Sequence, residues 1–451
     1  MRRHIRSCNN NVKYIFPGGA YKNPLTIFQL LEEIDIVVPE EDRFFPYFAT
    51  FDFECILEKL SSNLAGNTDK LEWISVHKPI SVSCCSNVPE FEEEVCFINT
   101  QQTLLLDEFI SHLNKISDAS YQHLLHKYEY VFTALDEHVI EESLKQSTHE
   151  SDLFDECQEE ERYQHLIECN EESESERDES ESESESESES ESDNDKQGDQ
   201  DKNKKTYCKY EHLKDSFDAY LRELPVLGFN SGKYDINAIK TSFFQLLIGD
   251  EDSELKFTVK KNNSYLCIKT EKLKFLDICN YLAPGFSYDQ FLKAYDSPVR
   301  KSFFPYEWFD HPDKLNHPSL PPYECFYSQL HQCNVLEREY SQFQKLLCQG
   351  HSEQKALQIL KLSSRPNTGQ ENYEELLRVW EDQSMQTFRD FLSFYNNLDV
   401  KPFVLALERL TEFYRGKGLD TFKVAMSVPG LASRIFLYSR QQLFFFTKRE
   451  E

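Results

Sequence analysis

Two acidic residues lie one position apart in a stretch of chain that is otherwise apolar and strand-like. The stretch is FATFDFECIL, residues 48–57, and the acids are Asp52 and Glu54. Side chains alternate along a β-strand, so both carboxylates leave the same face of a sheet. Two like charges in an apolar core repel each other and resist desolvation unless a cation lies between them. The pattern predicts a divalent metal site; the alternative is an edge strand whose polar face meets water.

A second motif, GFNSGKYD, offers another acid. An apolar strand ends near Phe229, the following turn carries Asn230, and Asp235 begins the next helix. An acid in this place can join a site at the carboxyl edge of a sheet. It can also serve simply as the N-cap of the helix.

A third motif, FYNNLDVKPF, adds Tyr395 and Asp399, whose spacing places them on one helical face. Proline fits only the first turn of a helix, so Pro402 predicts that a helix begins close to Asp399.

The segments that must position these residues alternate between strand and helix patterns, which predicts an α/β fold. Strand patterns cover residues 47–57, 79–88 and 94–100, and their order predicts an antiparallel meander. Helical periodicity covers residues 103–117 and 211–224. Residues 255–278 read as a hairpin with Asn262 and Asn263 at its tip, and residues 288–451 as mostly helical.

Composition separates a folded chain from one acidic segment. The 451 residues are 39% apolar and carry a net charge of −30, but residues 151–200 alone hold 22 acidic against 3 basic residues. Such a segment has too little apolar surface to bury, so residues 145–205 are predicted to be a disordered acidic Glu/Ser insertion. The 13 cysteines contain no CxxC pair, which argues against a disulfide framework and a complete zinc site. The sequence shows no signal peptide and no apolar run of about 18 residues, so we expect an intracellular protein that does not enter membranes.

The ordered set DFE, GFNSGKYD and YNNLD resembles the three exonuclease motifs of family B DNA polymerases, in the DEDD group of RNase H-like 3′–5′ exonucleases. The resemblance is closer to the protein-primed polymerases of Polinton (Maverick) mobile elements, through KYIFPGGAYKNPLTIFQLLEE, FATFDFEC, PVLGFNSGKYDIN and FLDICNYLAPGFSYDQFLKAY. It covers residues 13–435 apart from the acidic insertion. It implies an RNase H-like (DnaQ-type) exonuclease fold with a mixed central sheet and additional C-terminal helices.

The resemblance also implies roles for individual residues. The metal ligands would hold two Mg²⁺ or Mn²⁺ ions, and the positions that match them are Asp52, Glu54, Asp235 and Asp399. Tyr395 matches the tyrosine that positions the attacking water. Lys301, in RKSFFPYEW, matches a lysine that assists at the scissile phosphate.

Contacts to a single-stranded primer end are implied for four further residues. Asn230 and Tyr234 match two of these positions, and SYDQF supplies Ser287 and Phe291. Tyr288 stands where the family has a leucine, which is a departure from the motif. The implied partners are single-stranded DNA 3′ ends, primer–template DNA and a terminal priming protein, in the nucleus.

The expected organisation has five parts. They are a preamble (1–45), a first exonuclease part (46–144), the acidic insertion (145–205), a second exonuclease part (206–416) and the start of a polymerase portion (417–451). In the preamble, His4 and Cys8 have a spacing found in zinc fingers, either as a truncated remnant or as two ordinary residues. The synthetic motifs of family B polymerases, which resemble DxxSLYP and YxDTDS, do not occur. We therefore expect the exonuclease portion alone.

Two rival functions share these residues. The first is a non-catalytic remnant of a mobile-element polymerase that binds nucleic acid or protein. The second is a stand-alone RNA exonuclease with the same metal site.

Overall fold

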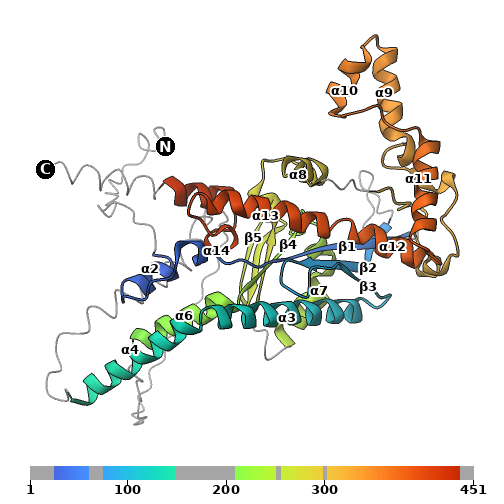
Figure 1. Ribbon diagram of the computed structural model, residues 1–451. Helices are drawn as coiled ribbons and strands as arrows, with labels where there is room; N and C mark the ends of the chain where they lie inside the picture. Colours follow the sequence, from blue (N-terminus) through green and yellow to red (C-terminus); the bar gives the residue numbers. More distant parts are fainter. Residues whose placement is uncertain (1–24, 60–74, 149–208, 250–254, 298–301, 437–451) are drawn as a thin grey trace, which may run out of the picture.

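A computed structural model of the protein describes residues 25–59, 75–148, 209–249, 255–297 and 302–436. His4, Cys8, Lys301 and nearly all of the predicted acidic insertion lie outside these ranges. The described residues form an α/β fold around one mixed seven-stranded sheet, with an outgrowth of helices at one end (Figure 1).

The sheet has the strand order β3-β2-β1-β4-β7-β6-β5. Strand β1 lies near its centre, antiparallel to β2 and parallel to β4, and β4 is parallel to β7. The hairpin of β5 and β6 extends the sheet beyond β7 in antiparallel pairing. The strands are β1 (Ala49–Lys59), β2 (Ser75–Ser86), β3 (Val95–Ile98), β4 (Leu224–Gly228), β5 (Leu255–Lys261), β6 (Ser264–Thr270) and β7 (Leu273–Asp277).

Helices cover both faces of the sheet (Figure 1), and one apolar core lies between the sheet and the helices on each face. The first face carries α2 (Ile27–Glu32), α3 (Gln102–Lys127), α4 (Glu129–Thr148), α6 (Lys209–Arg222) and α7 (Asp235–Gly249). The second face carries α8 (Tyr288–Ala294), α13 (Lys401–Arg415) and α14 (Thr421–Val424). Along β1, Phe51 and Phe53 point into the first core. Alternation therefore turns Asp52 and Glu54 toward the second face.

Residues 302–386 form the outgrowth, which is rooted in a third apolar cluster. Phe304, Phe309, Phe388 and Phe391 are buried together at its base. It contains α9 (Arg338–Cys348), α10 (Glu353–Leu360), α11 (Gly369–Asp382) and the short strands β8 (Tyr327–Ser328) and β9 (Cys333–Asn334), and it returns to the sheet through α12 (Phe388–Asn397). The 3₁₀ turns are η1 (Glu40–Asp42), η2 (Ile278–Tyr281), η3 (Pro312–Asn316), η4 (Tyr323–Phe326) and η5 (Val335–Glu337).

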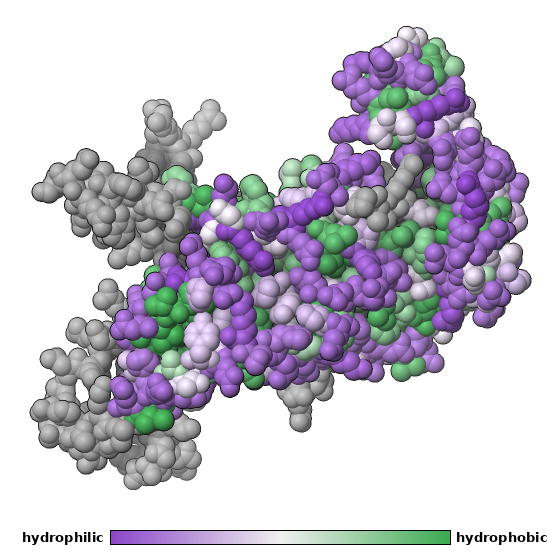
Figure 2. All heavy atoms as spheres, viewed as in Figure 1, coloured by the Kyte–Doolittle hydropathy of each residue, from purple (hydrophilic) through white to green (hydrophobic). Residues whose placement is uncertain are grey.

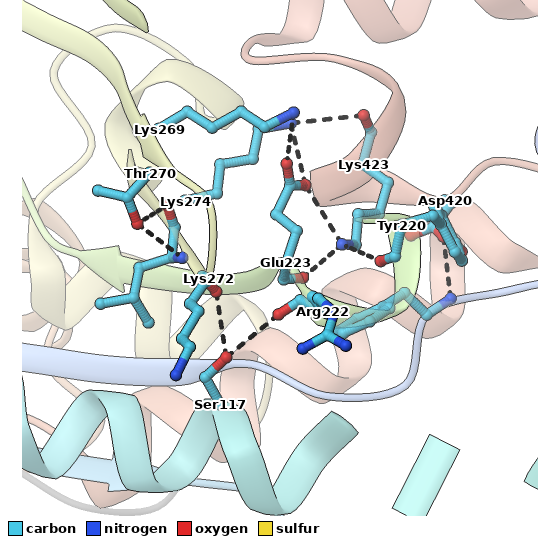
Figure 3. A network of polar contacts seen from close by, with 12 residues as sticks. Ser117, Tyr220, Arg222, Glu223, Lys269, Thr270, Lys272, Lys274, Asp420 and Lys423 are labelled. Atoms are coloured by element: carbon cyan, nitrogen blue, oxygen red, sulfur yellow. Dashed lines mark hydrogen bonds and ion pairs between the residues drawn. The ribbon is translucent and has the colours of Figure 1, made fainter. Parts of the chain in front are cut away.

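A buried network of charges fastens the segment after α13 to the sheet (Figure 3). The Glu223 carboxylate pairs with Lys269 at 2.9 Å, Lys423 at 3.2 Å and Lys274 at 3.8 Å. Burial alone would raise the pKa of Glu223, but the three ammonium groups hold it below its ordinary value. Burial lowers the pKa of Lys423 to about 8, because Glu223 offsets only part of the desolvation. Leu419, Phe422 and Met426 pack in the same apolar core as α13.

Several predicted elements are confirmed and others are corrected. The antiparallel meander of β1, β2 and β3 and the hairpin tip at Asn262 and Asn263 are confirmed. The hairpin continues into a third strand, β7, because Leu273 to Asp277 pair on the other side with β4. The first four residues of the predicted insertion are helical, since α4 runs to Thr148.

Candidate metal centre

Three carboxylates gather at the edge of the second face. One oxygen from each of Asp52, Glu54 and Asp399 lies within 4.8 Å of the other two. Glu54 is 5% exposed and Asp399 is 4% exposed, so two of the three charges are buried. Hard anionic oxygens at this separation are the donor set that Mg²⁺, Mn²⁺ and Ca²⁺ prefer. The arrangement fits a divalent cation, which would offset the mutual repulsion of the three acids.

The strand and the α12–α13 junction are held together by neutral hydrogen bonds. The Asn396 amide donates to the backbone oxygen of Asp52 at 3.1 Å, and Ser81 donates to the Asn396 side-chain oxygen at 2.9 Å. The Thr50 hydroxyl donates to the backbone oxygen of Val400 at 3.0 Å. These bonds bracket Asp399 on both sides and bring it to β1, more than 300 residues away in the chain.

The junction itself follows from local sequence. Helix α12 ends at Asn397 and α13 begins at Lys401, with Pro402 in its first turn. Asp399 therefore lies in the short connection between two helices, as the proline predicts.

Asp235 stands in the wall of the site and not in the carboxylate group. Among the described residues, Asp52, Glu54 and Asp399 form the one group of three or more His, Cys, Asp or Glu side chains whose ligand atoms all lie within 4.8 Å of one another. Asp235 lines a cavity of about 180 Å³ together with Asp52, Asp399, Asn230 and Tyr234. The expectation of four converging acids is thus met by three, with the fourth facing the same cavity from the first residue of α7.

The electrostatics of Cys55 agree with this placement. Burial raises the pKa of its thiol, and the charges of Glu54, Asp235 and Asp52 raise it further. The three acids therefore all lie near enough to Cys55 to act on its thiol, and two of them belong to the close carboxylate group.

The turn before Asp235 is shaped by a buried acid that sequence reasoning missed. Asn230 adopts a left-handed conformation with φ of 59°. Asp277, at the end of β7, accepts hydrogen bonds from the backbone N–H groups of Asn230 at 2.9 Å and Gly232 at 3.2 Å. Burial raises the pKa of Asp277, and these N–H donors oppose that rise. Its position at the end of the apolar strand β7 is the signal that could have found it.

Two tyrosine hydroxyls meet beside Glu54. The Tyr306 hydroxyl lies 3.2 Å from Oε1 of Glu54 and 3.0 Å from the Tyr395 hydroxyl. Burial raises the pKa of Tyr306 well above its ordinary value, and Glu54 and Tyr395 raise it further, so it stays a hydrogen-bond donor. Tyr395 is 2% exposed, and its ring packs 4.7 Å from that of Phe304. Sequence reasoning missed Tyr306 because a single tyrosine in an irregular segment has no spacing pattern.

The residues expected to contact a primer divide into exposed and buried ones. Tyr234 is 59% exposed at the mouth of the cavity, where Asn230 also lies. Ser287 caps the N-terminus of α8 by accepting a hydrogen bond from the Gln290 N–H group. Phe291 has no exposed surface and packs 5.7 Å from Phe403, so in this conformation its ring cannot touch a strand.

Tyr288 reaches the cavity in place of Phe291. Its hydroxyl donates to the backbone oxygen of Asp399 at 2.8 Å, and its ring packs against Phe229 at 5.2 Å and Phe403 at 6.0 Å. Of Ser287, Tyr288 and Phe291, Tyr288 is the one that lines the cavity.

Comparisons of the chain with protein-family models, with curated proteins and with solved structures find no match. In the described ranges, no helix combines the length and hydropathy needed to cross a lipid bilayer.

Proposed function

We propose that this chain is a metal-dependent 3′–5′ exonuclease of the RNase H-like class that acts on single-stranded DNA ends. The observation that carries the proposal is the group of Asp52, Glu54 and Asp399, contributed by a central strand and a distant helix junction. Asp235 on the wall of the same cavity supplies a fourth carboxylate.

The sheet supports the RNase H-like part of the proposal. An antiparallel meander begins with β1, and two strands parallel to β1, β4 and β7, continue the sheet on its other side. Asp52 and Glu54 lie on β1, and Asp235 follows β4 through the turn to α7. Because β1 and β4 are neighbours, these acids share one region of the sheet.

The chain's own residues suit phosphodiester hydrolysis. When bound, two Mg²⁺ or Mn²⁺ ions supply activation of the attacking water and stabilisation of the leaving 3′ oxygen. Asp52, Glu54, Asp399 and Asp235 would hold them. The Tyr395 and Tyr306 hydroxyls form a donor pair next to Glu54 and would orient the water. The exposed ring of Tyr234 offers a stacking surface for the terminal base.

The remaining parts of the proposal depend on the sequence resemblance alone. They are the place of this chain in a protein-primed family B polymerase, its action on primer–template DNA, the priming protein and the nuclear location.

The test is hydrolysis of a 5′-labelled single-stranded DNA oligonucleotide in Mg²⁺ or Mn²⁺. We expect stepwise shortening from the 3′ end, which Asp52→Asn and Asp399→Asn each abolish. Asp107→Asn, an exposed acid on α3 across the sheet, is the matched control and should leave the rate unchanged. Tight binding of the oligonucleotide without hydrolysis in either metal would instead support the non-catalytic remnant. Faster shortening of a matched RNA would support the RNA exonuclease.

A further inference from the structure

The outgrowth carries a basic segment in an acidic chain. Residues 338–365, from the start of α9 to the approach of α11, are called the basic arm below. The segment has five basic and two acidic residues, whereas the whole chain has a net charge of −30. Each basic residue is exposed, and in the described part of the chain none of them pairs with a carboxylate within 4.0 Å; they are Arg338, Lys345, Lys355, Lys361 and Arg365.

A hollow with aromatic walls lies where the basic arm meets α11. Its volume is about 620 Å³, and its lining includes Tyr323, Tyr340, Gln344 and Lys345. The Arg365 guanidinium lies 5.6 Å from the centre of the Tyr340 ring and donates to its hydroxyl at 3.2 Å. Exposed cations beside aromatic rings and amides are the combination with which proteins hold unpaired nucleic acid strands.

One acid also lines this hollow. The Glu337 carboxylate accepts a hydrogen bond from the Tyr323 hydroxyl. It lies at the foot of α9. Lys345 also lines the hollow, and Arg365 beside Tyr340 interacts electrostatically with Glu371 of α11.

The outgrowth that carries the basic arm is rooted at the metal centre. The chain leaves the centre after Tyr306 and returns to it at Tyr395, and the hydroxyls of these two residues are 3.0 Å apart. The base is stiffened by the Phe304 and Phe391 rings, which stack with centroids 6.1 Å apart at an angle of 4°. Figure 1 shows the arm projecting from this base on the side of the sheet that carries α8 and α13. Figure 2 shows mostly hydrophilic atoms over its outer surface.

We propose that the basic arm binds the single-stranded DNA whose 3′ end occupies the acidic cavity, at nucleotides several positions away from that end. This inference rests on the proposed exonuclease function, which supplies the substrate class. The basic arm would add a second region of contact with that substrate. The acidic cavity repels phosphates unless a cation is bound, so a positively charged surface at a distance supplies attraction that the catalytic pocket lacks.

The length of the DNA strand distinguishes binding at the cavity alone from binding at both contact regions. A strand of about 5 nucleotides is near the lower end of the span of a single-strand site, and we expect it to bind at the cavity alone. A strand of about 30 nucleotides can contact both regions, since single-strand sites commonly span about 4 to 16 nucleotides.

The experiment measures binding of labelled oligothymidines of these two lengths by the full chain, with Ca²⁺ in place of Mg²⁺. The arm variant is Lys345→Gln/Lys355→Gln/Lys361→Gln. We expect it to bind the longer strand about 10- to 100-fold more weakly at low salt, with a log–log salt slope reduced by about 2. Binding of the shorter strand should not change.

The matched control makes the same change in net charge on the opposite face of the sheet. It is Lys115→Gln/Lys127→Gln/Lys214→Gln, on α3 and α6. Lys127 and Lys214 pair with Asp42 and Asp136, so circular dichroism first verifies that the control is folded, and it should then bind both strands as the unmutated chain does. Equal losses in the control and the arm variant would show a non-specific charge effect and overturn the proposal.

A second pair of variants tests the ring in the hollow. Tyr340→Leu removes a stacking surface, and we expect about 5- to 150-fold weaker binding of the longer strand, which Tyr340→Phe largely restores. Unchanged binding in both the arm variant and Tyr340→Leu, with native circular dichroism, would overturn the proposal.

The outcome is independent of whether the chain hydrolyses DNA. The same measurements on Asp52→Asn test the arm alone, because this variant cannot complete the metal centre. Loss of length-dependent binding in the arm variant supports the arm even where no hydrolysis is seen. If the unmutated chain hydrolyses DNA and the arm variant still binds the longer strand more tightly than the shorter one, the proposed role of the arm is wrong. The exonuclease proposal is unaffected by that result.

Discussion

Replacing Glu54 by glutamine should stabilise the metal-free protein and weaken its response to metal. Glu54 is buried, and its carboxylate lies within 4.8 Å of ligand oxygens on Asp52 and Asp399. Glutamine has nearly the same size and keeps an oxygen that can accept the hydrogen bond from Tyr306. The substitution therefore removes one charge from the cluster with little change in packing.

The magnitude follows from the distances. Two unit charges 4.8 Å apart repel by about 3.5 kcal/mol at an effective dielectric constant of about 20. Partial access of solvent to Asp52 relieves part of this repulsion, so we expect Glu54→Gln to raise the free energy of unfolding in EDTA by about 1 to 3 kcal/mol. A bound cation makes the unmutated protein the more stable of the two, because the unmutated protein gains about 2.7 kcal/mol in its free energy of unfolding at a metal concentration 100 times its dissociation constant. The variant has lost one ligand and gains less.

The assay is the unfolding midpoint in urea, first in EDTA and then in increasing Mg²⁺ or Mn²⁺. Glu58→Gln is the control, because Glu58 is exposed on the same strand and its ion pair with Lys78 contributes less than about 1 kcal/mol. The reasoning fails if Glu54→Gln is less stable than the unmutated protein in EDTA and neither metal moves the midpoint of the unmutated protein. That result would mean that the three carboxylates do not share a cation.

Three other substitutions test separate parts of the structure. Tyr395→Phe keeps the packing on Phe304 and loses the hydroxyl that meets Tyr306, so we expect kcat for oligonucleotide hydrolysis to fall about 10- to 1,000-fold while the free energy of unfolding falls by only about 0.5 to 1.5 kcal/mol; an unchanged kcat would exclude a role for the hydroxyl. Asp277→Ala removes the acceptor of the turn N–H groups, which should cost about 1 to 3 kcal/mol in urea unfolding and speed hydrogen exchange at Asn230 and Gly232. Glu223→Gln leaves buried lysines without their carboxylate and should cost about 3 to 5 kcal/mol near neutral pH. Because the folded-state pKa of Glu223 is depressed, its contribution is complete above the unfolded value of 4.5 and is lost as the pH falls below it, so urea midpoints of variant and unmutated protein should converge in acid.

The parts of the fold that local patterns determine were predictable from the sequence. Alternation along β1 fixed which face Asp52 and Glu54 share, because the period of two holds within a single strand. Pro402 fixed the start of α13 to within two residues of Asp399, because its ring excludes a preceding helical turn. The tip of the β5–β6 hairpin followed from two consecutive asparagines.

Contacts between distant segments were not predictable in the same way. Tyr306 reaches Glu54 across 252 positions of sequence, and its segment has no periodicity that could place it. The separation of Asp235 from the three clustered acids depends on how the turn after β4 is held by Asp277, which lies on another strand. The motif implies that Phe291 contacts a primer, but α8 has only seven residues, and packing against α13 decides which of its side chains are buried.

The way the carboxylates are held explains why the site can exist before a cation binds. Mutual repulsion of about 3.5 kcal/mol for each pair would separate Asp399 from β1 if charge alone positioned it. The junction is instead fixed by neutral hydrogen bonds from Thr50, Ser81 and Asn396, each contributing about 0.5 to 1.5 kcal/mol, and by the apolar cores on either side of it. None of these bonds uses a carboxylate oxygen of the cluster. The segments that carry the acids are therefore assembled by other groups, and the binding energy of a cation is not spent on bringing those segments together.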